Sequence, residues 1–390
     1  MRHLIPTFFL LLSFALASCD SQQRSEVTPW GTQIGVDSIP QGDSFGFDDI
    51  VSNGEMIVLT MSGPDTYFDY HGRGMGLQYM LCEKFAQAIG VSLRVELCKD
   101  TTEIISRLKA GDGDIAAIQL PQSIKGLSFA GARVDTLRTA WAVQKGNEGL
   151  ADALNQWFKP QMIAEVARRE RFLLSAKAVK RRVYSPMLDR AGGVISRFDH
   201  YFKRYASLAR WDWRLMAAQC YQESTFDPDA RSWAGACGLM QIMPGTAAHL
   251  GLGQSRLMDP EDNIAAAARY IRELNGLFRD VPASERVSYV LASYNGGHYH
   301  VRDAMNLARK YGKNPNRWAD VQEFVLKLSS PTFYKDDVVK YGYLRGSETV
   351  DYVSKIHARW AQYRGVARGG GFSFPQTTPE RSKRGNRWHI

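Results

Sequence analysis

The chain of 390 residues carries 49 Lys and Arg against 40 Asp and Glu, which gives a formal net charge of +9, and 44% of its residues are hydrophobic. This is an ordinary globular composition, which excludes a largely disordered or fibrous chain, and the length allows two domains. The excess of positive charge favours an anionic partner such as an acidic polymer, an anionic membrane surface or nucleic acid.

The N-terminus has the features of an exported lipoprotein. Residues 1–18 combine a basic start, an apolar run over residues 4–17 and small residues directly before Cys19. The run is shorter than the roughly 20 residues that a membrane-spanning helix needs, and its architecture is typical of a secretory signal peptide. The sequence Leu-Ala-Ser-Cys at 16–19 resembles the lipobox of bacterial lipoproteins, which implies acylation of Cys19. The alternative is a signal peptide that contains a cysteine by chance.

Residues 19–45 are polar and predict a tether. We therefore expect a protein that faces the periplasm and is anchored through Cys19, in the outer membrane rather than the inner one. Asp20 keeps the choice open, because in some bacteria an acid at this position retains lipoproteins at the inner membrane.

Residues 46–160 alternate strand and helix signals. The runs GEMIVLTMS, VSLRVEL, DIAAIQL and TAWAVQKG predict strands, and GMGLQYMLCEKFAQAIG, TTEIISRLKAGDG and GLADALNQWF predict helices. This alternation predicts an α/β lobe with a mostly parallel sheet.

Several stretches of this region resemble one lobe of the periplasmic solute-binding proteins of the amino-acid type. They are Thr66-Tyr67, G-x-G-L at 74–77, KAGDGDIAAIQL and AWAVQKGNEGLADALN. In that family a second lobe is inserted after the strand that corresponds to DIAAIQL, and the ligand lies between the lobes. Here only residues 121–140 separate that strand from Trp141, so the second lobe is missing or reduced. We favour a scaffold role over small-molecule sensing and assign no ligand contact to Tyr67, Arg73 or Asp114.

The remaining chain divides by composition. Residues 161–194 are rich in Arg and Lys with helical periodicity, which predicts a basic linker helix with a solvated charged face. Residues 195–364 are dominated by helix formers without a convincing strand, which predicts an all-α domain large enough for its own core. Residues 365–390 form a Gly- and Ser-containing basic tail that we expect to be disordered.

Four cysteines remain beside Cys19. They form two local pairs, Cys82 with Cys98 and Cys220 with Cys237. Export permits disulfides, so one bridge in each half could form, and four buried thiols are the equal alternative.

The stretch WDWRLMAAQCYQES predicts a helix with Asp212 as its N-cap. Glu223 comes seven residues after Met216, which is close to two helical turns, so it projects from nearly the same apolar face. Burial there would raise the carboxyl pKa and keep the group protonated, as a general acid for glycoside cleavage requires. A surface glutamate at a frayed helix end is the alternative.

The residues that follow resemble the signature of the family 1 lytic transglycosylases, whose catalytic domain is similar to goose-type lysozyme. Four motifs occur in the order of that family: Glu223-Ser224 followed by Ser232, G-L-M-Q-I-M-P at 238–244, S-Y-N-G-G at 293–297 and E-T-V-D-Y-V at 348–353. The third motif departs from the family's A-Y-N-A-G at two small residues and keeps Tyr294 and Asn295. A truncated solute-binding lobe before such a domain resembles the membrane-bound members of that family.

This resemblance implies an enzyme that cleaves the β-1,4 bond between N-acetylmuramic acid and N-acetylglucosamine in peptidoglycan without water, for cell-wall remodelling. Glu223 would protonate the bridging oxygen. Its conjugate base would then accept the proton of the muramic C6 hydroxyl, which attacks C1 and closes a 1,6-anhydro ring. Because the substrate supplies the nucleophile, one carboxylate suffices.

The resemblance also implies supporting residues around the acid. Ser232, Gln241 and Tyr294 would form hydrogen bonds with the sugar and the acid, and Met240 would supply an apolar wall. Asn295, Glu348 and Tyr352 would brace the site, and Ser224 is the remaining supporting residue. For each of them ordinary helix packing is the alternative, which is weakest for Tyr294 and Gln241.

No other group of residues in the sequence indicates a metal or cofactor site. His298 and His300 have no further ligand-type residues at metal spacing, so no metal is expected, and no cofactor motif occurs. We expect peptidoglycan strands and a membrane as partners, and no nucleic acid. Two other functions stay open: a hydrolytic lysozyme, which would need a water-positioning carboxylate such as Asp212 or Asp227, and a non-catalytic peptidoglycan-binding lipoprotein.

Overall fold

The computed structural model describes residues 46–366. The expected signal peptide, the lipidation site Cys19, the tether and the tail from residue 367 lie outside the described residues. No helix within residues 46–366 is both long enough and apolar enough to cross a membrane.

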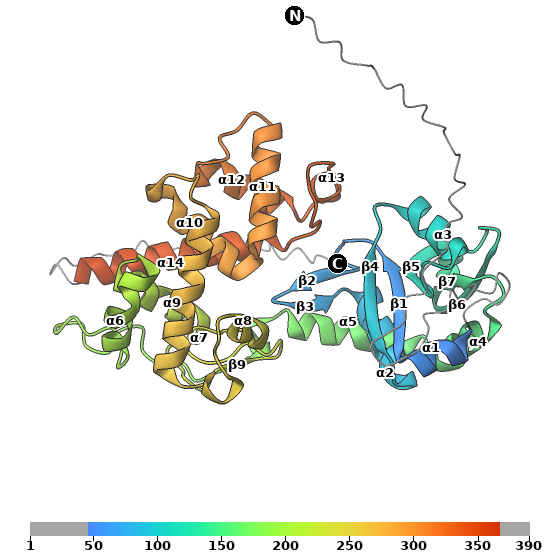
Figure 1. Ribbon diagram of the computed structural model, residues 1–390, viewed down its shortest axis with the longest axis horizontal. Helices are drawn as coiled ribbons and strands as arrows, with labels where there is room; N and C mark the ends of the chain where they lie inside the picture. The colour runs from blue at the N-terminus through green and yellow to red at the C-terminus, as the bar shows by residue number, and fades with distance from the viewer. Residues whose placement is uncertain (1–45, 367–390) are drawn as a thin grey trace, which may run out of the picture. The chain divides into compact units, whose positions relative to one another are not determined.

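The first region is an α/β lobe around a five-stranded sheet, in the order β4-β1-β5-β7-β6 (Figure 1). The strands are β1 Glu55–Thr60, β4 Ser92–Leu97, β5 Ile115–Pro121, β6 Leu127–Val134 and β7 Thr139–Gln144. Strand β1 pairs in parallel with β4 and β5, whereas β7 is antiparallel to both β5 and β6. The sheet is therefore mixed. Strand β6 was not predicted, and the links around it are too short for the helical crossovers that parallel pairing needs.

Helices cover both faces of this sheet. They are α1 Phe47–Asn53, α2 Leu77–Ile89, α3 Thr101–Ala110, α4 Glu148–Trp157 and α5 Gln161–Leu173. Successive side chains of a strand point to opposite faces, and β5 follows this rule: Ile115 joins the core under α2 and α4, while Ala116 joins the core under α3. A small hairpin, β2 Phe68–Tyr70 and β3 Arg73–Met75, precedes α2.

Helix α5 corrects the linker prediction for residues 161–194. Its Val166 is buried in the same core as Phe85 and Trp141, and α5 packs against α2. The basic residues Arg168 and Arg169 are exposed, so the solvated charged face is confirmed. The apolar stripe of the helix extends the lobe core beyond residue 160, because an amphipathic helix buries its apolar side where a partner surface is available.

The second region is helical. Its helices are α6 Asp199–Ala209, α7 Trp213–Ser224, α8 Pro244–His249, α9 Pro260–Leu277, α10 Ala283–Gly296, α11 His298–Lys310, α12 Trp318–Lys327, α13 Pro331–Tyr334 and α14 Gly346–Val366. Short 3-10 helices span Asp135–Leu137, Ala176–Ala178 and Gln254–Arg256. The long helix α14 packs against α7, α10 and α12, and one continuous core runs through the region. This arrangement packs the fourth motif, which lies on α14, against α7, the helix that carries Glu223.

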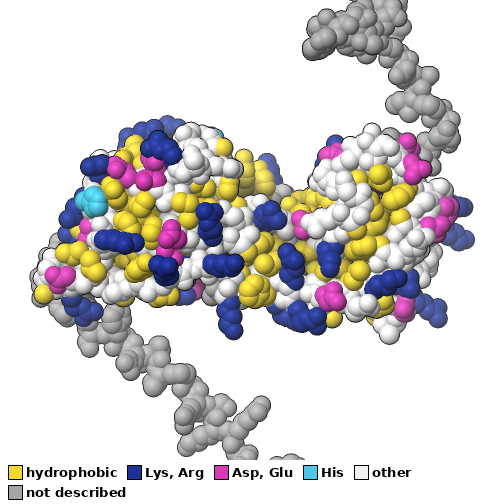
Figure 2. All heavy atoms as spheres, turned by 90° about the horizontal axis from the view of Figure 1, so that it is seen from below, with side chains coloured by type: hydrophobic (Ala, Val, Ile, Leu, Met, Phe, Trp, Pro, Cys, Tyr) yellow, Lys and Arg dark blue, Asp and Glu magenta, His cyan; other side chains and the backbone are white. Residues whose placement is uncertain are grey.

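One strand pair corrects the expectation that this region contains none. Residues Val179–Lys180 (β8) pair antiparallel with Arg231–Ser232 (β9). Two-residue strands leave no periodic pattern in a sequence, which is why the pair escaped prediction. Figure 2 shows that Lys and Arg side chains are spread over the face in view and not gathered in one patch.

Candidate active site

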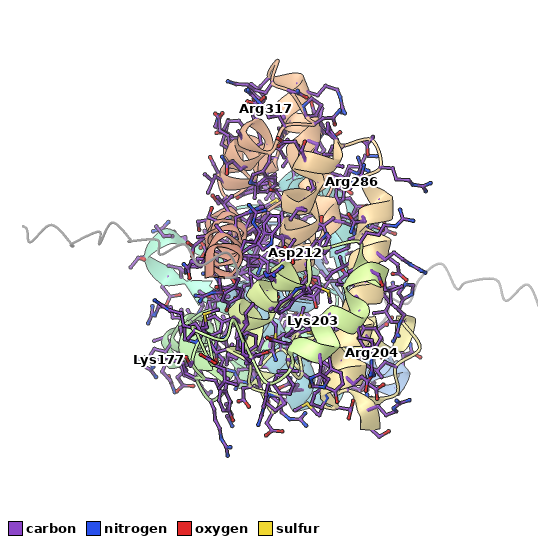
Figure 3. All side chains as sticks on the ribbon, turned by 90° about the vertical axis from the view of Figure 1, so that its left-hand side faces the viewer. Lys177, Lys203, Arg204, Asp212, Arg286 and Arg317 are labelled. Carbon is purple, nitrogen blue, oxygen red and sulfur yellow. The ribbon has the colours of Figure 1, made fainter. Side chains whose placement is uncertain are left out.

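Helix α7 is fixed at its start by side chains from two other helices. The predicted N-cap is confirmed, since Asp212 Oδ1 accepts a hydrogen bond of 2.9 Å from the Arg214 amide. The other oxygen, Oδ2, accepts from Trp360 Nε1 of α14 at 3.2 Å. Lys203 of α6, labelled beside Asp212 in Figure 3, places its ammonium 4.7 Å from the centre of the Trp213 ring. These contacts set the direction in which the far end of α7 points.

That far end stores backbone strain. Helix α7 stops at Thr225, which has a φ of 54°, and Phe226 follows with a φ of 62°. Gln241, in the second motif, has a φ of 47°. Residues other than glycine enter this left-handed region at a cost and persist there only where the surroundings impose it, often at functional sites. Glu223 therefore lies at the edge of a constrained loop.

The Glu223 carboxyl is half-buried and is held by Tyr352 of α14. The Tyr352 hydroxyl donates to Glu223 Oε1 at 2.5 Å and itself accepts from Gln219 Nε2 at 3.2 Å. Burial raises the pKa of Glu223 to about 7, against the hydrogen bond from Tyr352 and the charges of His71 and Arg181, which lower it. At neutral pH the carboxyl can therefore give a proton and take one back.

Tyr294, from the third motif, lies close to this carboxyl. Its hydroxyl donates to the Met240 carbonyl at 2.8 Å. Burial first, and then the charge of Glu223, raise the Tyr294 pKa well above its ordinary value. Tyr294 and Tyr352 are thus both neutral hydroxyl donors beside Glu223.

The second motif is built around a side chain that sequence reasoning missed. Asn263, in the first turn of α9, accepts from the Met240 amide at 2.8 Å and donates to the carbonyls of Cys237 at 3.1 Å and Leu257 at 2.8 Å. Gly238 packs directly on it: a Cβ at this glycine would lie 2.6 Å from Asn263 Nδ2, and its φ is 75°. Asn263 lies outside the four motifs, so no local signal marks it.

Three side chains of this loop make contacts within the protein. Met240, which was expected to supply an apolar wall, is completely buried in the helical core. The side-chain nitrogen Nε2 of Gln241 donates to the carbonyls of Ala230 at 3.1 Å and Gly238 at 2.9 Å. The Ser232 Oγ accepts from the backbone amide of Ala236 at 3.0 Å. These two side chains brace the loop.

The fourth motif brings a second carboxylate into the site. Glu348 Oε1 accepts from the Tyr70 hydroxyl at 2.8 Å and lies 3.5 Å from His71 Nε2, while Oε2 lies 3.0 Å from Arg345. Burial opposes the charged form, but the hydrogen bond and charge of His71, the charge of Arg345 and the Tyr70 hydroxyl together lower the pKa of Glu348. Tyr70 and His71 belong to the β2–β3 hairpin, and nothing in the sequence links them to Glu348.

The remaining supporting residues make local structural bonds. Asn295 Oδ1 accepts from Thr349 at 2.9 Å, which joins the third motif to the fourth. The buried Ser224 hydroxyl donates to the Cys220 carbonyl at 3.2 Å. The Ser224 bond lies within helix α7, whereas the Asn295 bond connects α10 with α14.

The four cysteines of the described residues are buried free thiols, so neither local pair is bridged. Cys220 Sγ donates to the Leu239 carbonyl, and Cys237 Sγ donates to the Gly235 carbonyl. Each thiol therefore has its own backbone partner. Among the described residues no group of three His, Cys, Asp or Glu could hold a metal ion, and the pKa of His300 is lowered to about 4 by burial.

The helical region is similar to a known family of domains. Residues 200–316 match the model of the transglycosylase SLT domain. The match ends before α14, so the fourth motif and Tyr352 lie outside it.

Two relatives of the chain share one name. The chain is similar to membrane-bound lytic murein transglycosylase F of Desulfosudis oleivorans, at 35% identity over 56% of this chain and 48% of that protein. The similarity to the protein of the same name from Marinobacter nauticus is 28% over 79% of this chain and 81% of that protein. The chain thus spans about half the length of the first relative. Of the solved structures, the arginine-bound form of domain 1 from TmArgBP matches 30% of this chain and 98% of its own, at 21% identity and a TM-score of 0.26.

Proposed function

We propose that this protein is a lytic transglycosylase that cleaves the β-1,4 bond between N-acetylmuramic acid and N-acetylglucosamine in peptidoglycan. The observation that carries the proposal is the Tyr352–Glu223 hydrogen bond of 2.5 Å at a carboxyl whose pKa burial raises to about 7. A domain of the transglycosylase SLT family and relatives named lytic murein transglycosylase support it.

In the proposed reaction Glu223 serves first as acid and then as base. Its proton passes to the bridging oxygen, which leaves as the hydroxyl of N-acetylglucosamine while positive charge develops at C1 of the muramic sugar. The carboxylate, steadied by the Tyr352 hydroxyl, then accepts the proton of the C6 hydroxyl as that oxygen bonds to C1. The product is a 1,6-anhydro end, Glu223 regains its proton, and no water is consumed.

The other carboxylates support a reaction without activated water. Asp212 is occupied by the Arg214 amide and Trp360, and the buried Asp227 accepts from the amides of Arg182 at 2.6 Å and Asp229 at 3.2 Å. Both oxygens of Glu348 are held by Tyr70, His71 and Arg345. A hydrolytic lysozyme needs a carboxylate that can activate or position water, and these three are already engaged.

The surrounding residues and the location complete the proposal. Tyr294 would orient the acid, and Ser232 and Gln241 would meet the sugar once their loop contacts exchange for substrate. Residues 1–18 would be removed and Cys19 acylated, which would place the enzyme on the periplasmic side of a membrane, in reach of the cell wall that it remodels.

The test is the variant Glu223→Gln, which keeps the shape of the side chain and its bond to Tyr352 but cannot donate a proton. We expect loss of murein lysis of at least about a thousandfold, whereas Glu273→Gln, a change at an exposed glutamate of α9, should retain activity. Mass spectrometry of the digest should find anhydro-muramic ends. Reducing muramic ends would instead establish a hydrolase, and undiminished lysis by Glu223→Gln would remove the acid from the mechanism.

A further inference from the structure

The segment that precedes the helical region is bonded to the loop that follows Glu223. Strand β8 pairs with β9 through Val179 opposite Ser232 and Lys180 opposite Arg231. The Arg182 amide then donates to Asp227 at 2.6 Å, and the Thr225 hydroxyl donates to the Arg182 carbonyl at 2.8 Å. Residues 179–182 therefore lie in a fixed position across the end of α7.

This position brings the Arg181 guanidinium to the carboxyl end of the helix. Its Nη1 donates to the Glu223 carbonyl at 2.8 Å and to the Gln222 carbonyl at 3.3 Å. The last carbonyls of a helix have no partner within the helix, and a cation there also interacts favourably with the helix dipole. Arg181 thus caps α7 at the residue that carries the acid, although the sequence predicts only a solvated charge run in this segment.

Four further side chains act on the Glu223 carboxyl from the elements packed around it. Tyr352 and Glu348 approach from α14, His71 from the turn between β2 and β3, and Tyr294 from α10. The charges of His71 and Arg181 favour the carboxylate, and the charge of Glu348 opposes it. His71 is charged only when protonated, whereas a guanidinium is charged at every pH at which an enzyme is assayed.

We propose that Arg181 is a positioning residue for Glu223, which holds the end of α7 through two backbone carbonyls and contributes a permanent positive charge beside the acid. The inference rests on the proposed role of Glu223. It extends the catalytic centre to a residue that precedes the matched SLT domain by 19 positions in the chain.

The test is the pH profile of kcat/KM on purified murein, measured for the full chain in detergent as wild type, Arg181→Gln, Arg181→Lys and Arg182→Gln. The Arg182 side chain is exposed, so Arg182→Gln removes an adjacent positive charge without touching α7. We expect Arg181→Gln to move the alkaline limb to higher pH, because the carboxyl loses a charge that favours ionisation. Its kcat on the plateau should fall about fivefold with the loss of the two carbonyl contacts.

Arg181→Lys should restore the position of the limb, because it restores the charge, while part of the kcat loss persists. Arg182→Gln should match wild type in both respects. A limb of Arg181→Gln that coincides with wild type, or an equal shift in Arg182→Gln, would overturn the inference. If Arg181→Gln does not fold, Arg181→Lys decides: a limb displaced from wild type would refute the role of the charge. Activity of Glu223→Gln reports separately on the proposed function.

Discussion

The Tyr352 hydroxyl lies 2.5 Å from Glu223 Oε1, although 129 positions separate the two residues in the sequence. Tyr352 is one turn beyond Glu348 on α14, and Gln219 is one turn before Glu223 on α7. The two consecutive hydrogen bonds, from Gln219 to Tyr352 and from Tyr352 to Glu223, therefore form only because α14 packs against α7. They give the carboxyl one fixed orientation.

Removal of the hydroxyl in Tyr352→Phe should act on both the pH range and the rate. The hydrogen bond lowers the pKa of Glu223, so its loss should move the alkaline limb of kcat/KM to higher pH. We expect kcat to fall about tenfold and the free energy of unfolding to fall by about 1–2 kcal/mol, since Gln219 also loses its acceptor.

The matched control is Tyr363→Phe on the same helix, where a buried tyrosine hydroxyl donates to the Pro186 carbonyl at 2.7 Å. This variant should lose a similar amount of stability without a displaced pH limb. A limb that moves equally in both variants would show that the effect of Tyr352 is one of general destabilisation.

The raised pKa of Glu223 predicts that the acid lowers the stability of its own fold. The folded state binds the proton more tightly than the unfolded state, because burial raises the pKa from 4.5 to about 7. The carboxyl therefore contributes a loss of stability that begins above about pH 4.5 and is complete above about pH 7. The free energy of unfolding of Glu223→Gln should therefore exceed that of wild type by an amount that grows with pH, up to at most about 3 kcal/mol.

Urea unfolding of wild type and Glu223→Gln at pH 5 and pH 8 checks this sign. The difference between the two proteins should be larger at pH 8. Glu273→Gln, at an exposed glutamate, should give a difference that does not grow. A Glu223→Gln difference that shrinks from pH 5 to pH 8 would mean that the folded state stabilises the carboxylate.

Gly238→Ala should disturb the second motif through one added carbon. The new Cβ would lie 2.6 Å from Asn263 Nδ2, and the φ of 75° is strained for alanine. We expect a loss of about 2–4 kcal/mol in the free energy of unfolding and a reduced kcat, because Asn263 anchors the loop next to Tyr294. Thermal unfolding and murein lysis measure the two effects.

Gly245→Ala is the matched control on α8. No atom lies within 4 Å of its added Cβ, and its φ is ordinary for alanine, so stability should stay within about 0.5 kcal/mol of wild type or rise. If Gly238→Ala is as stable as this control, the loop can move away from Asn263 and accommodate the added Cβ.

Local sequence determined those features of the protein that one element carries by itself. The cap at Asp212, strand β5 and the helix that bears Glu223 follow from hydrogen-bonding groups and periodicities within a few turns. The four motifs are visible in the sequence through their resemblance to a known family. For Glu223 the helical pattern left burial and exposure both open, and packing decided for burial, which raises its pKa.

Only the tertiary structure decided which partners those residues meet. Met240 lies in the helical core, α14 places Tyr352 beside Glu223, and the β8–β9 pair places Arg181 at the end of α7. The antiparallel half of the sheet and the burial of α5 belong to the same group. Each depends on contacts between segments far apart in the chain, whose geometry is fixed by packing and by the pairing of buried polar groups, and neither leaves a periodic signal in the sequence.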